Sequence, residues 1–248
     1  MPLFLSVIIP AYNEEARLPT TLSATAAYFD EQFPGGYEIL VVDDGSADAT
    51  AEVVHAASRK HPAVKLAQYG ANRGKGYAVR HGMLEARGEW RLFCDADLAT
   101  PVEEFDVIFA RMKAQGASVG IGSRPLRESH LVVHQPWYRE ALGRGFNRVV
   151  QLLAVPGIQD TQCGFKIFSE RAARDIFALC RLDGFAFDAE ALYLAQRLGY
   201  KIVEVPIRWS HKAGSKVSML RDGLRMLADL ARVRRMHRGV RRTAAADA

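Results

Sequence analysis

The chain has 248 residues, 49% of them hydrophobic and 25% charged, which is typical of a globular protein with one large α/β domain. Six arginines between Arg232 and Arg242 exceed the formal net charge of +5 by themselves, because no acidic residue lies among them. The rest of the chain is close to neutral, which argues against a nucleic-acid-binding surface spread over the fold.

The first half of the chain alternates short apolar runs with helical stretches. The apolar runs predict strands at residues 3–9, 39–42, 64–66 and 92–94. Apolar residues from Leu18 to Phe29 follow the spacing of an amphipathic helix, and Ser46 and Asp48 are candidate N-caps for the next helix. This order predicts a Rossmann-like, mostly parallel sheet flanked by helices and joined by right-handed crossovers.

Beyond residue 122 the regular alternation stops. The later pattern predicts helices at residues 138–153, 172–179 and 188–198 and strands at 165–168 and 201–207. We expect residues 1–217 to form one domain, whose two halves are residues 1–122 and 123–217.

Residues 218–238 predict an amphipathic C-terminal helix, followed by a basic to disordered tail at residues 239–248. A helical projection puts an apolar stripe on one side, made of Leu220, Leu224, Leu227, Leu230 and Ala231, with Met226 and Val233 at its margin. Two interpretations stay open: a last helix packed on the core, or a helix resting on an anionic membrane surface. The Arg-rich segment after it favours the membrane.

The cysteines and the hydropathy pattern bear on location. Cys94, Cys163 and Cys180 are far apart and include no C-x-x-C pair, so neither a disulfide framework nor a zinc site is predicted. No window reaches the roughly 18 uninterrupted apolar residues of a spanning helix, and the N-terminal apolar run lacks the basic flank of a signal peptide. We expect a cytoplasmic protein whose membrane contact, if any, is peripheral.

Acidic motifs follow three of the predicted strands, in residues 10–14, Asp43-Asp44-Gly45-Ser46 and Asp95-Ala96-Asp97. Open α/β sheets bind their ligands at the carboxyl ends of the strands, so these carboxylates should meet at one site. A single D-x-D pair also serves in caps and loops, but Asp95 and Asp97 together suit a hard cation such as Mg²⁺ or Mn²⁺.

The segment Asn72-Arg73-Gly74-Lys75-Gly76 combines a flexible backbone with two cations before a predicted helix, whose N-terminus favours phosphate. Its spacing is not that of a P-loop. No Gly-x-Gly-x-x-Gly follows the first strand, which argues against a dinucleotide dehydrogenase. A nucleotide carried by a divalent cation is the simplest ligand for this edge of the sheet.

Taken together, these motifs resemble the inverting glycosyltransferases of family 2, which have the GT-A nucleotide-sugar-binding fold. Four segments are similar to the dolichyl-phosphate β-glucosyltransferases and their prokaryotic polyprenyl-phosphate relatives: residues 95–101, Gly122-Ser123-Arg124, residues 160–166 and Gly214-Ser215-Lys216. The resemblance implies a hexosyltransferase that moves glucose from UDP-glucose to a polyprenyl (dolichyl-type) phosphate on the cytosolic face of a membrane, with inversion and metal assistance.

The resemblance also implies roles for single residues. Residues 1–122 would bind the nucleotide sugar, with Asp43 at the base and Asp95 and Asp97 on the metal, and residues 123–217 would build the acceptor side. The donor would be bound by Pro10, Ala11, Tyr12, Glu14, Asp43, Asp44, Arg73, Lys75, Asp95, Ala96 and Asp97. Some mannosyl-transferring relatives carry glutamine as a further metal ligand where this chain has Ala99, which weakens a mannosyl assignment.

An acceptor phosphate is anionic near neutral pH, so its attack needs positioning more than deprotonation. The departing nucleoside diphosphate needs its charge neutralised, for which the metal and Lys75 or Arg73 are candidates. The candidate cations for the acceptor phosphate are Arg124, Arg139, Arg144, Lys212 and Lys216, of which Arg124 and Lys216 are preferred.

Asp188 and Asp160 are the candidate catalytic carboxylates. Relatives that act on hydroxyl acceptors keep a base in the region of Asp188, whereas with a phosphate acceptor this residue would bind sugar hydroxyls or orient a cation. Capping of a helix is the alternative for Asp188.

Three other functions stay open: GDP-mannose as the donor, transfer to a soluble acceptor, and a nucleotide-sugar-binding protein without catalysis, recruited to the membrane. Asp95, Asp97 and Lys75 together speak against the last function, since a protein that only binds need not organise a metal at the leaving diphosphate.

Overall fold

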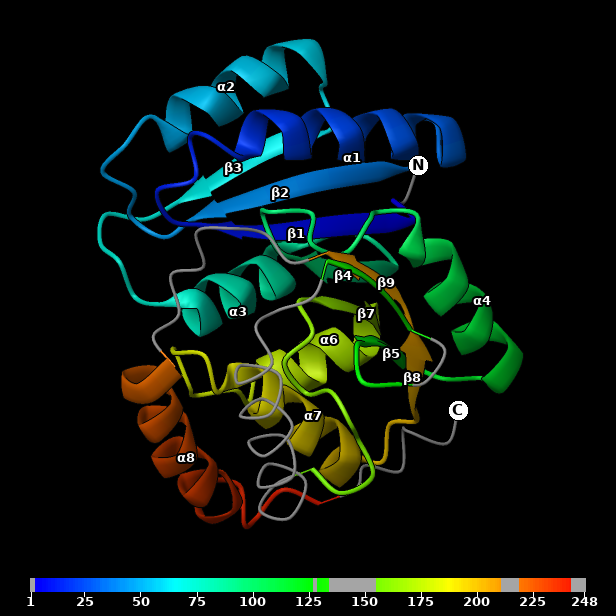
Figure 1. Cartoon of the computed structure of the whole chain (residues 1–248), viewed down its shortest axis with the longest axis vertical. Helices are drawn as coiled ribbons and strands as arrows, with labels where there is room; N and C mark the ends of the chain where they lie inside the picture. The colour runs from blue at the N-terminus through cyan, green and yellow to red at the C-terminus, as the bar shows by residue number, and fades with distance from the viewer. Residues whose placement is uncertain (1–2, 127–128, 134–154, 211–218, 242–248) are drawn as a thin grey trace.

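The computed structural model describes residues 3–126, 129–133, 155–210 and 219–241, and its centre is one sheet with helices on both faces (Figure 1). The seven strands of this sheet are β1 (Leu5–Ala11), β2 (Tyr37–Asp43), β3 (Val64–Gln68), β4 (Trp90–Cys94), β5 (Val119–Ser123), β7 (Phe165–Ser169) and β8 (Ile202–Pro206). A separate pair is formed by β6 (His130–Val133) and β9 (Arg208–Ser210). The helices are α1 (Leu18–Gln32), α2 (Thr50–Lys60), α3 (Lys75–Glu85), α4 (Glu104–Gln115), α6 (Glu170–Phe177), α7 (Phe187–Leu198) and α8 (Met219–Met236).

The strand order is β3-β2-β1-β4-β7-β5-β8, and every neighbouring pair is parallel except those that β7 makes. β7 runs antiparallel to both β4 and β5. The predicted mostly parallel sheet flanked by helices is therefore confirmed. Strands of the second half, β7 and β8, belong to the same sheet as β1 to β5.

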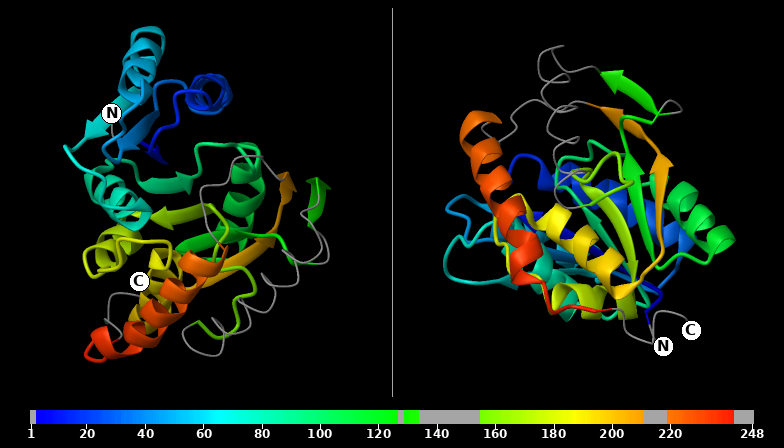
Figure 2. Two further views of the ribbon diagram at one scale, coloured as in Figure 1. Left: turned by 60° about the vertical axis from the view of Figure 1, so that its left-hand side comes forward. Right: turned by 90° about the horizontal axis from the view of Figure 1, so that it is seen from below.

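Both faces of the sheet are covered, which explains the continuous apolar runs of its strands. Val7 and Ile9 of β1 pack in the cluster that α1, α2 and α4 complete, whereas Ile8 faces the cluster of α3, α6, α7 and α8. Figure 2 shows these two helical layers on either side of the sheet.

The C-terminal helix packs against the core in its described part. Met226, Leu230 and Val233 of α8 are buried, and α8 lies beside α7 in both views (Figures 1 and 2). Ala231, which the projection put on the apolar side, is exposed, because the buried stripe is centred on Leu230 and Val233. Among the described helices, none is long and apolar enough to cross a bilayer. The helix predicted at residues 138–153 lies outside the described residues.

The strand directions show which edge of the sheet carries the acidic motifs. The carboxyl ends of β1, β2, β4 and β5 share one edge of the sheet, and the antiparallel β7 begins at that same edge. Cys94, the last residue of β4, is paired with Phe165, the first residue of β7. The D-x-D motif after β4 therefore lies beside the segment that precedes β7.

Candidate active site

The turn after β2 is held by Asp43 and by the segment that follows β1. The buried Asp43 carboxylate accepts hydrogen bonds from the backbone N–H and the hydroxyl of Ser46, at 2.9 and 2.5 Å. The Ser46 hydroxyl in turn accepts the Asn13 amide at 2.9 Å. The N-cap of α2 is Ala49, so the prediction that Ser46 or Asp48 occupies this position is wrong. Ser46 binds the loop after β1, whereas the Asp48 carboxylate accepts both the Glu15 amide of that loop and the amide of Thr50, the first residue of α2, at 3.1 and 3.0 Å.

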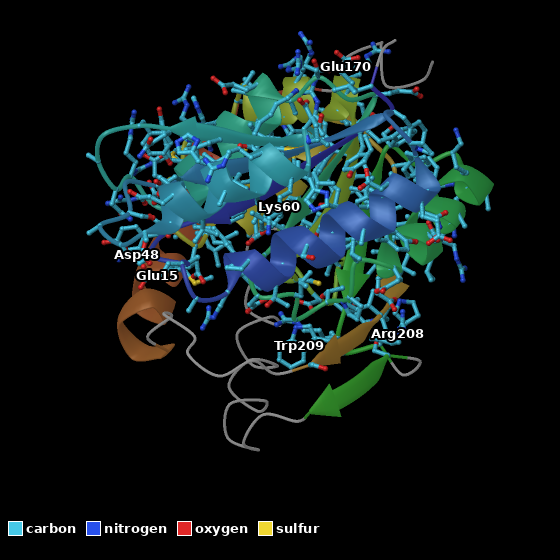
Figure 3. All side chains as sticks on the ribbon, turned by 90° about the horizontal axis from the view of Figure 1, so that it is seen from above. Glu15, Asp48, Lys60, Glu170, Arg208 and Trp209 are labelled. Carbon is cyan, nitrogen blue, oxygen red and sulfur yellow. The ribbon has the colours of Figure 1, made fainter. Side chains whose placement is uncertain are left out.

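The segment after β1 lies directly over this turn. Pro10 and Ala11 end the strand, and the Ala11 carbonyl accepts the Asp44 amide at 2.8 Å. The Glu14 amide donates to the Thr50 hydroxyl at 2.8 Å. Figure 3 shows the neighbouring Glu15 and Asp48 side by side. Tyr12 is 40% exposed there, which puts an aromatic side chain at the carboxyl edge of the sheet.

Asp44 holds the glycine-rich loop in place. Its carboxylate accepts the backbone amides of Arg73 and Gly74, at 2.7 and 2.8 Å, and the hydroxyl of Tyr69 at 2.9 Å. Gly74 has a φ of +103°, and a Cβ there would lie 2.5 Å from the Asp183 carbonyl oxygen, so this position requires glycine. The Arg73 guanidinium stacks over the Tyr77 ring, 3.6 Å from its centroid.

Lys75, at the first position of α3, reaches across to the D-x-D motif. Its ammonium lies 2.7 Å from an Asp95 carboxylate oxygen. Burial by itself would lower the pKa of Lys75, but the charges of Asp95 and Asp188 outweigh burial and raise it. The ammonium therefore stays protonated at the carboxyl end of β4, where it can meet an anion.

The D-x-D motif is fixed by contacts from three directions. The Asp95 amide donates to the Gly164 carbonyl at 3.1 Å, and a Cβ at Gly164 would overlap the Asp95 carboxylate. The Thr21 hydroxyl donates to the carbonyl of the buried Ala96 at 2.7 Å. The Asp97 carboxylate accepts the Ala99 amide at 2.9 Å, and burial and the charge of Asp95 raise the pKa of Asp97.

These features fit a divalent cation. The Asp97 carboxylate, whose pKa is raised by burial and by the Asp95 charge, gains from a positive charge between the two carboxylates, and their oxygens are the ligands that Mg²⁺ and Mn²⁺ prefer. Mg²⁺ commonly takes one or two carboxylates and completes its shell with substrate phosphates and water. Within the described ranges no cluster of three or more His, Cys, Asp or Glu side chains could hold a metal, so Asp95 and Asp97 would need those additional ligands.

Asp188 lies in the first turn of α7 and is buried against Lys166 of β7. The Lys166 ammonium, whose side chain is 2% exposed, donates to Asp188 and to the Cys163 carbonyl. Burial raises the pKa of Asp188, although the charges of Lys166 and Lys75 oppose it. The capping alternative does not hold, since the N-cap of α7 is Ala186.

Asp160 is paired with Arg124, which directly follows β5. The fully buried Asp160 carboxylate accepts both sides of the Arg124 guanidinium, at 2.7 and 2.8 Å, and the Arg124 amide at 3.1 Å. Burial would raise the pKa of Asp160, but the Arg124 charge outweighs it and holds this pKa below its usual value. Asp160, predicted as a catalytic carboxylate, and Arg124, predicted to bind the acceptor phosphate, thus form one bidentate ion pair.

A small hollow opens between the D-x-D motif and β9. It is lined by Asp95, Ala99, Thr100, Gly164, Phe165 and Trp209. Trp209 lies on β9 (Figure 3), and the Arg124 guanidinium lies 5.6 Å from the centroid of its ring. Asp95 and the Trp209 ring thus line the same hollow, with the Arg124 guanidinium near that ring.

The structure brings together most of the residues selected from the sequence, and it adds others. Arg139, Arg144, Lys212 and Lys216 lie outside the described residues. Sequence reasoning missed Thr21, and it gave no role to Gly164 and Lys166, although both lie in the segment 160–166 that carries the family resemblance. Lys166 carried a usable signal, because a single charged residue inside the apolar run of β7 requires a buried partner.

Comparisons with known proteins identify the family of the chain. A family model described as glycosyl transferase family 2 matches residues 6–177. The chain is 40% identical over 242 residues to a dolichyl-phosphate β-glucosyltransferase of Dictyostelium discoideum, covering 94% of this chain and 74% of that protein. It is 42% identical over 237 residues to a protein of the same name from Drosophila melanogaster, covering 91% of this chain and 73% of that one.

The fold also matches solved structures. One is the crystal structure of glucosyl-3-phosphoglycerate synthase from Mycobacterium tuberculosis in complex with Mn²⁺, UDP-glucose and phosphoglyceric acid. Its TM-score is 0.65 at 19% identity, and the match covers 92% of this chain and 80% of that chain. At this identity the similarity shows the shared fold.

Proposed function

The chain belongs to glycosyl transferase family 2 and is a hexosyltransferase with the GT-A fold, and on this premise we propose that it transfers glucose from UDP-glucose to a dolichyl-type polyprenyl phosphate. The Lys75–Asp95 pair carries the proposal, because it sets a protonated amine 2.7 Å from the first carboxylate of a D-x-D motif at the ligand edge of the sheet. The names of the similar proteins support glucose and dolichyl phosphate as the transferred group and the acceptor.

The donor would lie along the carboxyl ends of β1, β2 and β4. Tyr12 would contact the base, and Asp43, which is fully buried, would act on the base through the turn that it holds. Lys75 and Arg73 would face the diphosphate, beside the N-terminus of α3. Asp95 and Asp97 would hold Mg²⁺ or Mn²⁺, and the charge of that ion would stabilise UDP as the leaving group.

The chain's own residues would perform the transfer by positioning. The sugar would occupy the hollow beside Asp95 and Trp209, with the acceptor phosphate near Arg124. One phosphate oxygen attacks the anomeric carbon as the bond to UDP breaks, which inverts the configuration, and an ionised phosphate needs no general base. Asp160 would then orient Arg124, and Asp188 would orient the buried Lys166, since each carboxylate is paired with that cation.

We place the protein on the cytosolic face of a membrane. Arg232 and Arg235 of α8 are exposed on the side away from the buried Leu230 and Val233, and Arg234 is exposed on the side next to α7. Clustered arginines next to an amphipathic helix attract anionic headgroups. Flotation of the full chain with vesicles that contain anionic lipid, and not with neutral vesicles, is the expected result; equal flotation with both would contradict this placement.

The test of the reaction uses the purified chain, Mn²⁺, a short polyprenyl phosphate and either UDP-glucose or GDP-mannose, and it follows release of UDP or GDP. We expect lipid-dependent UDP release that disappears in EDTA and in Asp97→Asn. Glu52→Gln, an exposed carboxylate of α2, is the matched control and should keep full activity.

The alternative functions give other outcomes in the same assay. Release of GDP alone would assign GDP-mannose as the donor. UDP release that requires a soluble phosphate acceptor, and not the lipid, would show that the acceptor is soluble. Binding of UDP without any turnover would support a protein that only binds the nucleotide sugar.

A further inference from the structure

We propose that Glu190 is a positioning residue for the diphosphate site. Together with His237, it fixes the turn at residues 181–184, and this turn supports the loop Gly74-Lys75-Gly76. The identity of the ligand rests on the proposed function, whereas the mechanical connection rests on the contacts of Glu190 alone.

Glu190 is fully buried on α7, and each of its carboxylate oxygens has a hydrogen-bonding partner. One oxygen accepts the backbone amides of Arg181 and Leu182, at 3.0 and 2.8 Å. The other lies 2.7 Å from Nε2 of His237, a residue that directly follows α8 and is 2% exposed. A buried carboxylate with these partners binds α8, α7 and the turn together.

The turn then contacts the glycine-rich loop at close range. The Asp183 carbonyl accepts the Gly76 and Tyr77 amides, at 2.7 and 3.3 Å. A Cβ at Gly74 would lie 2.5 Å from the same carbonyl oxygen, and a Cβ at Gly76 would overlap the Leu182 carbonyl oxygen. The loop is therefore packed directly on the turn, with no side chain between the two backbones.

The loop carries the residue that meets the anion. Lys75 lies between these two glycines and its ammonium is 2.7 Å from Asp95. Asp44 holds the loop from the other side, through the Arg73 and Gly74 amides. Without the support from residues 181–184, Asp44 would hold the loop backbone from one side only, so the position of Lys75 would become less well defined.

A second contact keeps the turn near α3 when Glu190 is changed. The Asp183 carboxylate lies 2.6 Å from the Arg80 guanidinium of α3. A variant of Glu190 should therefore displace the turn locally and keep the fold, which makes the proposal testable in the full chain.

The test measures amide exchange at residues 74–77 and the affinity for UDP in the presence of Mn²⁺, by hydrogen-exchange mass spectrometry and calorimetry. In Glu190→Ala we expect exchange at the Gly76 and Tyr77 amides to rise about tenfold and the Kd for UDP to rise about tenfold. Glu190→Gln keeps an oxygen that can accept the turn amides, so it should show a clearly smaller change in both.

Leu198→Ala is the matched control, because Leu198 is buried at the other end of α7 and its truncation leaves the Glu190 contacts in place. It should lower the melting temperature and leave both readouts as in the unmodified protein. Unchanged exchange in Glu190→Ala, or an equal rise in Leu198→Ala, would overturn the proposal.

Lys75→Met separates this inference from the proposed function. If UDP affinity is unchanged in both Lys75→Met and Glu190→Ala while exchange at residues 74–77 still rises in the latter, the diphosphate does not bind at this loop. That outcome would refute the proposed donor site and the ligand role of Glu190, and it would leave the structural connection established.

Discussion

Replacing Asp160 with asparagine should destabilise the fold and not only slow the reaction. The Asp160 carboxylate is fully buried and accepts the Arg124 guanidinium at 2.7 and 2.8 Å, the Arg124 amide at 3.1 Å and the Gln162 amide at 3.2 Å. Asparagine keeps one acceptor oxygen but removes the negative charge and puts an N–H group against the guanidinium.

The magnitude follows from the burial of the pair. Removing one partner of a fully buried ion pair costs about 3–5 kcal/mol, because the other charge remains without compensation. The Arg124 side chain is 29% exposed, so water screens part of this loss. We therefore expect the free energy of unfolding to fall by about 2–3 kcal/mol in Asp160→Asn.

The assay is urea denaturation of the unmodified protein and of Asp160→Asn at a series of pH values. Arg124 holds the pKa of folded Asp160 below its usual value of 3.8, so the folded state prefers the ionised carboxylate. The contribution of the pair is then fully present above that usual value and is lost as the pH falls through the folded pKa. The stability difference between the two proteins should be constant near neutral pH and shrink in acid.

A difference below about 0.5 kcal/mol at neutral pH, equal to that of an exposed substitution such as Glu52→Gln, would refute this reasoning. Native-like stability combined with complete loss of turnover would instead place Asp160 at the reacting atoms.

Three further predictions concern the same edge of the sheet. Lys75→Met should lower kcat/KM for the sugar donor about a hundredfold, as steady-state kinetics would measure, since it removes a charge next to the leaving group; a loss below threefold would contradict that placement. Gly164→Ala should weaken Mn²⁺ binding at least about tenfold in a calorimetric titration, because the added methyl group overlaps the Asp95 carboxylate, and unaltered Mn²⁺ affinity would be evidence against Asp95 as a ligand. Burial raises the pKa of Cys163 to about 12 and raises that of Cys94 further, so neither thiol should react with a thiol reagent near pH 8 until urea unfolds the protein; rapid modification of the folded chain would show that they are accessible.

Much of the candidate site followed from local patterns. The apolar runs that end just before Asp43 and Asp95 predicted strands whose carboxyl ends meet. The observed parallel pairing of β1 with β2 and β4 brings those ends together. The segment around Lys75 was predicted to precede a helix, and α3 begins at Lys75, although its glycines serve a close contact with the Asp183 carbonyl that the sequence did not predict. These features could be predicted from the sequence because a strand, the turn that follows it and the next residue are contiguous in the chain.

The local reasoning failed where a distant group competed for a side chain. Ser46 has the chemistry of an N-cap, but the Asn13 amide and the Asp43 carboxylate, brought near by the pairing of β1 with β2, bind its hydroxyl. An N-cap preference contributes about 1 kcal/mol, which two such hydrogen bonds can exceed.

The sequence by itself determined the layered α/β fold, the edge of the sheet that carries the candidate site and the carboxylates of the D-x-D motif, because each depends on periodicity and on strand ends. Only the tertiary structure decided that β7 enters the sheet antiparallel and brings Gly164 to Asp95. It also decided that Asp160 pairs with Arg124, and Glu190 with His237. Such pairs join residues 36 and 47 positions apart in the chain, so packing of whole elements, and no local preference, selects the partner of each buried charge.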